Sequence, residues 1–178
     1  MKHKKMLILI LIVSLIIIGV RAVYALYPTP LKEYVMTLAD KYEIDYLLIY
    51  AIIQTETHFD TNAVSRSNAK GLMQIMDQTG NWAAEELDLI NFEPQDLFDP
   101  FTNIKIGTWY ISKLIKQYGN DIDKALMAYN AGSGNVAKWL SDTRYSSDGI
   151  TVHTIPFEET RNYIIKVNFH YTIYKFLY

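Results

Sequence analysis

The sequence predicts an all-α domain of six or seven helices that follows an N-terminal membrane-spanning helix. Three observations predict this class. Apolar residues recur along the chain at the three- and four-residue spacing of amphipathic helices. Helix-start signals, the Asp99-Pro100 pair and Pro156, precede two of these stretches. No pair of alternating runs flanks a hairpin turn, so a β-sheet is not expected.

The first 26 residues differ in composition from the rest. A basic start, "MKHKK", precedes fifteen uncharged apolar residues from Met6 to Val20. Counting on through Arg21 to Leu26 gives 21 residues, about the length that spans a bilayer when the arginine side chain reaches back to the headgroups. A signal peptide cleaved after Ala25 also fits. We favour the uncleaved anchor because the run is long for the apolar part of a signal peptide.

The lysines before this run predict that the N-terminus stays in the cytoplasm and that the rest of the chain lies outside, attached to the cytoplasmic membrane through the N-terminal helix. A cleaved signal peptide would place the same residues outside as a secreted protein. We therefore divide the chain into an anchor at 1–26, a linker at 27–30 and a domain at 31–178.

Composition excludes several functions for the domain. Without the first 26 residues the 17 basic residues fall to 13 against 19 acidic ones, a formal charge of −6, so a nucleic-acid partner is not expected. There are no cysteines, which excludes disulfides and thiolate chemistry. The four histidines have no metal-ligand spacing, and we expect neither a metal nor a cofactor.

The domain divides into helices separated by recognisable interruptions. Loops are predicted at 62–71, 92–98 and 144–154, the last with room for a short extended piece. Helices are expected from Leu31, after Asp45, after Asp77, from Asp99-Pro100 to a stop at 118–120, across 121–132, across 132–142 and from Pro156 to the C-terminus.

One helix carries an unusual charge. The apolar residues Leu48, Ile49, Ile52 and Ile53 recur at helical spacing, and the next position of the same stripe is Glu56. Three explanations fit: a charged helix end in water, a buried ion pair with a distant arginine, or a general acid whose apolar surroundings keep it protonated near neutral pH. The spacing alone does not choose among them.

Four separated motifs surround this glutamate. "ETHF" at 56–59 is followed by "SRSNAKGLMQIMDQT" at 65–79, by "AYNAG" at 128–132 and by "PFEETRNY" at 156–163. In this order they resemble the catalytic domain of the soluble lytic transglycosylases, glycoside hydrolase family 23 of the lysozyme-like superfamily. The resemblance covers roughly 31–178 and implies a lysozyme-like helical fold around a glycan cleft.

The resemblance also implies roles for individual residues. Glu56 matches the catalytic acid, and Ser65 matches a serine that hydrogen-bonds near the acid and the substrate. Glu159 matches a second glutamate that supports the site. The remaining matches line the sugar groove or its floor: Gln74, Met76, Tyr129 and Asn130.

Three positions depart from the family pattern. Thr57 replaces a serine and keeps its hydroxyl. Asp77 replaces a proline, and we expect it to start the next helix by capping. Asn68 replaces a glycine, which is tolerable at a positive φ because asparagine visits that region more easily than most residues.

The implied activity is cleavage of the β-1,4 bond between N-acetylmuramic acid and N-acetylglucosamine in the glycan strands of peptidoglycan, with formation of a 1,6-anhydromuramoyl end. A goose-type lysozyme that hydrolyses the same bond and a non-catalytic wall-binding or assembly protein are the alternatives. If the acid role is right, Glu56 is largely buried, has a raised pKa and faces Ser65, Gln74 and Tyr129 across a cleft.

Overall fold

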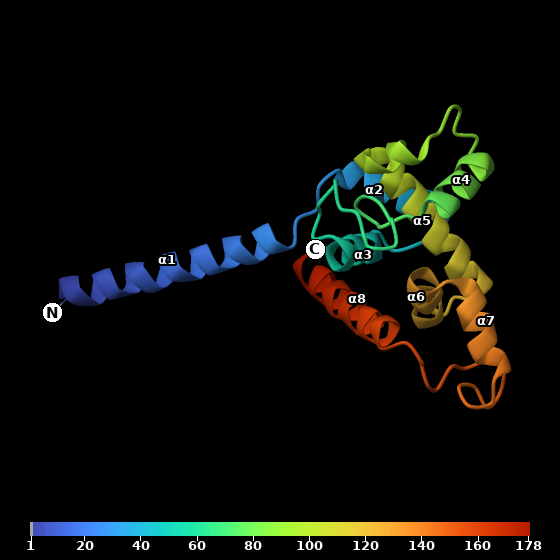
Figure 1. Ribbon diagram of the computed structural model, residues 1–178. Coiled ribbons are helices and arrows are strands. Elements are labelled where there is room, and N and C mark those ends of the chain that lie inside the picture. The colour runs from blue at the N-terminus through green and yellow to red at the C-terminus, as the bar shows by residue number, and fades with distance from the viewer. Residues whose placement is uncertain (1) are drawn as a thin grey trace.

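The computed structural model describes residues 2–178 as one long helix attached to a helical body (Figure 1). Over these residues it contains eight α-helices, one short 3₁₀-helix and two isolated β-bridges, which confirms the all-α class and the predicted number of helices. The elements are α1 (Lys2–Leu26), α2 (Lys32–Tyr42), α3 (Tyr46–Glu56), α4 (Asp77–Glu86), η1 (Pro94–Phe98), α5 (Pro100–Gln117), α6 (Ile122–Ala131), α7 (Ser133–Ser141) and α8 (Glu158–Leu177).

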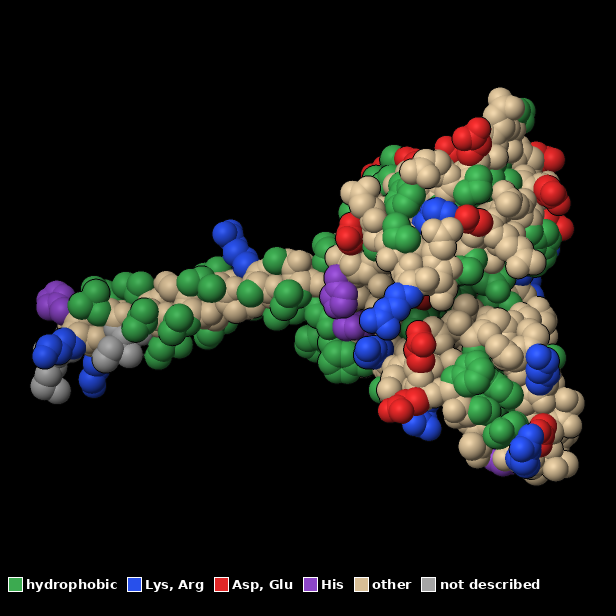
Figure 2. All heavy atoms as spheres, viewed as in Figure 1, with side chains coloured by type: hydrophobic (Ala, Val, Ile, Leu, Met, Phe, Trp, Pro, Cys, Tyr) green, Lys and Arg blue, Asp and Glu red, His purple; other side chains and the backbone are tan. Residues whose placement is uncertain are grey.

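Helix α1 stands away from the body, and its described side chains are exposed on all sides (Figures 1 and 2). From His3 to Leu26 it is long and apolar enough to cross a membrane, and it is the one such helix among residues 2–178. A helix that is hydrophobic all round and unburied needs an apolar environment other than the protein core.

Helix α3 lies at the centre of the body. Asp45 caps its start by accepting a hydrogen bond from Leu47 N at 2.9 Å, and every residue from 47 to 54 is buried. Helix α8 is its principal neighbour. The two are joined near one end by the stacked rings of Tyr50 and Tyr174, whose centroids are 5.6 Å apart, and at the other by Tyr163 beside Glu56.

Helices α5, α6 and α7 complete the core, and α6 packs against both α5 and α8. The predicted start of α5 is confirmed: Asp99 accepts a hydrogen bond from Thr102 N at 2.8 Å, and Pro100 occupies the first helical position. Trp109 of α5 and Trp139 of α7 are both buried in this core.

The segment between α3 and α4, residues 57–76, is a long loop held by one buried side chain from α5. Asn103 is 1% exposed; its Oδ1 accepts from Met73 N at 2.8 Å, and its Nδ2 donates to Lys70 O at 2.9 Å and Leu97 O at 2.7 Å. Gly71 makes the close approach possible. It has φ +69°, and a Cβ there would lie 2.2 Å from Leu97 O.

The predicted loop at 144–154 is confirmed, but it consists of turns and bends and contains no extended strand. The reason is a side chain that folds the backbone on itself. Asp148 Oδ1 accepts hydrogen bonds from Ile150 N at 2.8 Å and Thr151 N at 2.7 Å, a local pattern that competes with strand formation.

We predict that Asn103→Ala lowers the free energy of unfolding by about 3 kcal/mol, because one buried N–H and two buried C=O groups lose their partner. Urea denaturation of the full chain in detergent, followed by tryptophan fluorescence, measures the change. Asn62→Ala, an exposed asparagine in the same loop, is the matched control and should change stability by less than about 0.5 kcal/mol. Equal midpoints for the two variants would contradict the central role of Asn103.

Candidate active site

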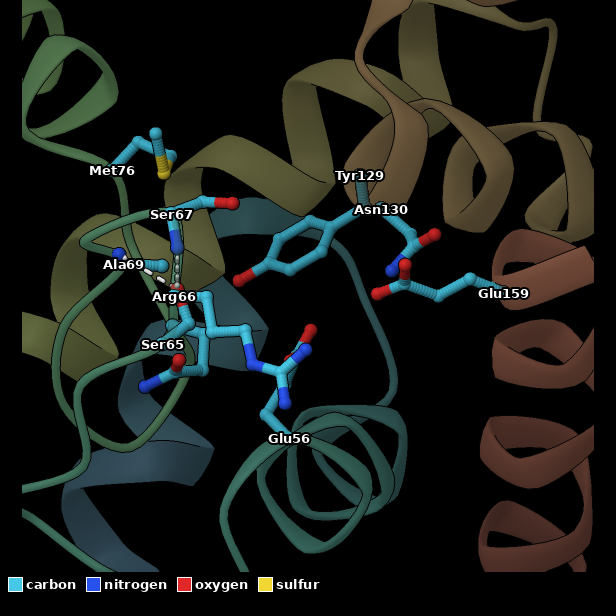
Figure 3. A pocket seen from close by; sticks show the side chains of 10 residues that line it. Glu56, Ser65, Arg66, Ser67, Ala69, Met76, Tyr129, Asn130 and Glu159 are labelled. Carbon is cyan, nitrogen blue, oxygen red and sulfur yellow. Dashed lines mark hydrogen bonds between the residues drawn. The ribbon is translucent and has the colours of Figure 1, made fainter. Parts of the chain in front are cut away.

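A cleft lies where the end of α3, the 57–76 loop, the end of α6 and the start of α8 meet (Figure 3). Its central part has a volume of about 480 Å³ and is lined by Glu56, Ser65, Arg66, Ser67, Ala69, Gln74, Met76, Tyr129, Asn130 and Glu159. All seven residues that the sequence selected are therefore brought together. Two adjoining hollows share this lining, one of about 420 Å³ toward Tyr110 and one of about 290 Å³ toward Tyr163.

Glu56 is the last residue of α3, so the apolar stripe of that helix carries its side chain into the cleft. Glu56 as a whole residue is half-buried. Burial raises its pKa from 4.5 to about 7; the hydroxyl of Tyr163 opposes the rise, and the negative charge of Glu159 adds to it. Of the three explanations for this residue, the apolar acid is the one that matches these surroundings.

The two competing explanations match these contacts less well. Glu56 is at a helix end, as the first requires, but its carboxyl group is not free in water. None of the ion pairs within residues 2–178 includes Glu56. In the view of Figure 3 the Arg66 guanidinium overlaps Glu56, but no ion pair joins the two side chains. The charged form of Glu56 is thus left without a paired cation, and burial is therefore the largest influence on its pKa.

Two tyrosines flank the carboxyl group. Tyr129 projects from the end of α6 and donates a hydrogen bond to Met73 O at 2.7 Å, which ties the cleft floor to the loop. Tyr163 of α8 places its buried hydroxyl beside Glu56, but no acceptor lies in ordinary hydrogen-bond geometry. Burial and the nearby Glu56 raise the pKa of both phenols well above their usual range, so both remain neutral donors.

Ser65 and Gln74 shape the loop that faces Glu56. Ser65 Oγ accepts hydrogen bonds from Ser67 N at 3.2 Å and Ala69 N at 3.0 Å, and neither bond uses the hydroxyl proton. Gln74 has φ +49°, and its Nε2 donates to Gly71 O at 3.0 Å and Ala63 O at 3.3 Å. Both side chains hold the backbone of the 57–76 loop in place, and the hydroxyl proton of Ser65 is left available to a ligand.

The departures from the family pattern are linked to one another. We expected Asp77 to cap α4, and this prediction is wrong: Met76 is the N-cap and Asp77 is the first helical residue. Its carboxylate instead forms an ion pair with Lys70 and accepts a hydrogen bond from Asn68 Nδ2 at 3.1 Å. Asn68 has φ +64°, as the glycine position predicts. Thr57 Oγ1 donates to Leu72 O at 2.9 Å and so joins α3 to the loop.

Asn130 and Glu159 form the wall on the α8 side, where their side chains point toward one another (Figure 3). Asn130 Oδ1 accepts a hydrogen bond from the buried Thr160 at 2.7 Å, which fixes the end of α6 to the start of α8. Glu159 is exposed in the first turn of α8 and acts on Glu56 through its charge. Met76 is exposed at the opposite rim.

Tyr163, Arg66 and Lys166 are among the cleft residues that were not selected from the sequence. Tyr163 lies one helical turn after Glu159, so its spacing within "EETRNY" was a usable signal. Arg66 lines the central part and Lys166 the smaller hollow beside Tyr163. No residue spacing predicts these two, because each reaches the cleft only through the tertiary packing of the loop and of α8 around Glu56. Within residues 2–178 no three histidine, aspartate or glutamate side chains converge on a metal position.

Comparison with known proteins agrees with this geometry. The family model "Transglycosylase SLT domain" matches residues 33–150. The soluble lytic murein transglycosylase of Escherichia coli is 35% identical over 136 residues, which cover 75% of this chain and 21% of that protein. The membrane-bound lytic murein transglycosylase C of Photorhabdus laumondii is 36% identical over 149 residues, 72% of this chain and 42% of that protein.

Among solved structures, an inactive glutamate-to-glutamine mutant of the lytic transglycosylase Slt from Pseudomonas aeruginosa superposes with a TM-score of 0.71 at 31% identity, over 83% of this chain and 24% of that one. This likeness confirms the predicted lysozyme-like fold. The present chain spans less than half the length of each of these relatives. Because the family model matches well over half of the chain, the protein belongs to the Transglycosylase SLT domain family.

Proposed function

We propose that the protein is a peptidoglycan lytic transglycosylase with Glu56 as its single catalytic acid and base. The observation that carries the proposal is a carboxyl group with a pKa of about 7 at the centre of an elongated cleft. The names of the relatives support the substrate class, and the Pseudomonas relative is described as inactive when one glutamate becomes glutamine.

The proposed reaction needs one protein carboxyl group. Protonated Glu56 donates its proton to the glycosidic oxygen as the bond to C1 of N-acetylmuramic acid breaks and N-acetylglucosamine leaves. The N-acetyl oxygen of the substrate stabilises the positive charge at C1. The Glu56 carboxylate then takes the proton of the C6 hydroxyl, O6 attacks C1, and the 1,6-anhydro ring closes. The nucleophile belongs to the substrate, so proximity replaces a second carboxylate.

A pKa near 7 suits this double role. A group with this pKa is protonated often enough to act as an acid near neutral pH, and its conjugate base is strong enough to accept the C6 proton. Among the described residues that line the central cleft, Glu159 is the other carboxylate, and it is exposed. We assign it an electrostatic role, because its charge raises the pKa of Glu56.

The remaining site assignments follow from position. Ser65, with its free hydroxyl proton, is proposed to donate to the substrate beside the acid. Gln74, Met76, Tyr129 and Asn130 line the hollow that continues toward α4, and we propose that they hold sugar rings there.

We also propose that residues 1–26 anchor the protein in the cytoplasmic membrane, that 27–30 form a linker, and that 31–178 form the catalytic domain outside the cytoplasm. The apolar length of α1 and a relative named membrane-bound support the anchor. The lysines before the apolar run support this orientation.

We predict that Glu56→Gln abolishes release of fragments from purified peptidoglycan, because the amide can neither donate nor accept the transferred proton. Mass spectrometry should identify 1,6-anhydromuramoyl ends in the wild-type products. Glu85→Gln changes an exposed glutamate of α4 and should leave the products unchanged. Reducing ends in place of anhydro ends would identify a lysozyme. Unchanged release by Glu56→Gln would exclude the proposed role of Glu56.

The raised pKa predicts a pH-dependent difference in stability between the wild type and Glu56→Gln. Folding raises the pKa of Glu56 from 4.5 to about 7, so the folded state binds more protons than the unfolded state between these values. The wild-type free energy of unfolding should therefore fall, relative to the variant, as the pH rises from about 4.5 to about 7. Urea denaturation at a series of pH values measures the difference, and a constant difference would contradict the raised pKa.

We predict that the full chain stays in the membrane fraction after alkaline carbonate washing, with its mass showing that residues 1–26 are retained. Protease added to intact spheroplasts should digest a C-terminal tag, because the domain lies outside. A chain about 25 residues shorter in the medium would instead identify residues 1–25 as a cleaved signal peptide.

A further inference from the structure

Helix α8 has an apolar outer stripe in addition to the face that it buries. Val167 and Tyr174 point into the core, yet Ile165, Phe169 and Phe176 are 61%, 59% and 87% exposed. The spacings of four and seven residues place these three side chains on one side of the helix. Several large apolar side chains exposed together on one side of a helix, unlike a single one, indicate a surface that contacts something else.

The end of this stripe lies where α1 joins the body (Figure 1). Tyr24 of α1 donates a hydrogen bond to Leu177 O at 3.3 Å and meets the ring of Tyr178 edge-on, with centroids 5.6 Å apart. Tyr178 in turn donates to Tyr27 O at 2.8 Å. These contacts fix the last turn of α8 beside the C-terminal end of α1.

The linker itself is held against the same helix. Tyr174 donates a hydrogen bond to Pro28 O at 3.1 Å, and Tyr50 of α3 donates to Pro30 O at 2.8 Å. Prolines at 28 and 30 stiffen this short connection further. The linker at 27–30 is therefore fixed to α3 and α8, and the end of α8 keeps a defined position relative to α1.

Apolar surface surrounds the linker. In Figure 2 the hydrophobic side chains of α1 continue onto the adjoining part of the body. On the far side of the linker, an apolar hollow of about 480 Å³ is lined in part by Pro28, Leu31 and Phe101, and Phe101 is itself 48% exposed. Continuity with an apolar helix of membrane-spanning length indicates that lipid covers this end of the domain.

The charges near the stripe fit a bilayer surface. Lys175 lies beside Phe176 and Lys166 beside Ile165, both exposed, and the acidic residues of α8 are confined to its opposite end. The ammonium of Lys32, at the start of α2, lies 5.6 Å from the ring centroid of Tyr178. Aromatic rings with lysines around them are the composition that favours the headgroup region of an anionic membrane.

We propose that Phe169, Phe176, Tyr178 and Lys175 dock the domain on the outer surface of the bilayer in which α1 is anchored. The proposal rests on the proposed anchor. It has a consequence for the cleft: Tyr163 precedes Phe176 by 13 residues, so the acid site lies within about 20 Å of the docked end. Docking holds the cleft near the membrane and directs it to the glycan strands closest to that surface.

The test uses the full chain in liposomes of phosphatidylethanolamine and phosphatidylglycerol. Because the natural chain has no cysteine, one nitroxide label can be placed on Phe176→Cys without competing sites. Collisions with oxygen, which concentrates in lipid, are compared with collisions with a water-soluble nickel chelate. Labels at Ile16→Cys in α1 and at the exposed Ile90→Cys, between α4 and η1, are the lipid and water references.

We expect an oxygen-to-nickel ratio at residue 176 several-fold above that at residue 90 and approaching that at residue 16. A water-like ratio at 176 with a lipid-like ratio at 16 would overturn the docking and leave the anchor intact. A water-like ratio at 16 would overturn the anchor itself. Exclusion of both reagents from 176 would mean that protein, such as a second copy of the chain, covers the surface, and would also overturn the proposal.

Discussion

The burial of α3 against α8 is the constraint on which the rest of the structure depends. Helix α3 is apolar on all sides, so it must be covered all round, and the body is built to do so. Its last residue is a glutamate, and covering the helix necessarily removes much of the water around that carboxyl group. The raised pKa of Glu56 is thus a direct consequence of core packing, and the chemistry of the cleft begins with it.

The facing wall of the cleft is built on a different principle. The 57–76 loop buries Leu72, Met73 and Ile75 in the core, and hydrogen bonds to single polar groups position the rest of it: Asn103 from α5, Thr57 at the end of α3 and Tyr129 from α6. Asn103 and Tyr129 connect the loop to α5 and α6, and Thr57, the C-cap residue of α3, ties the middle of the loop to the end of that helix. A polar network of this kind fixes geometry because every member must be satisfied, and it leaves the outward-facing groups of the loop free to meet a ligand.

Helix α8 connects the acid site to the proposed membrane surface. One end contributes Glu159 and Tyr163, which act on the pKa of Glu56 in opposite directions. The other end holds Tyr174 and Tyr178, which brace the linker. A single rigid helix therefore determines both the environment of the acid and its distance from the membrane.

The sequence by itself determined the class, the helices and seven of the residues around the cleft. Local signals were sufficient there: Asp99-Pro100 starts α5 because capping and a fixed φ act within one turn, and the ordered motifs selected Glu56 and its six neighbours. Only the tertiary structure decided the solvent exposure and the bonding partners of each side chain. Periodicity left Glu56 open to three explanations, because a pKa depends on what covers the carboxyl group, and the cover comes from α8, a hundred residues later. Asp77 looked like a cap and became the partner of Lys70 and Asn68, because a folded loop brings those side chains to it. Contacts between segments that are distant in the sequence determine the solvation and the pairing of these side chains. Local residue spacing does not predict such contacts.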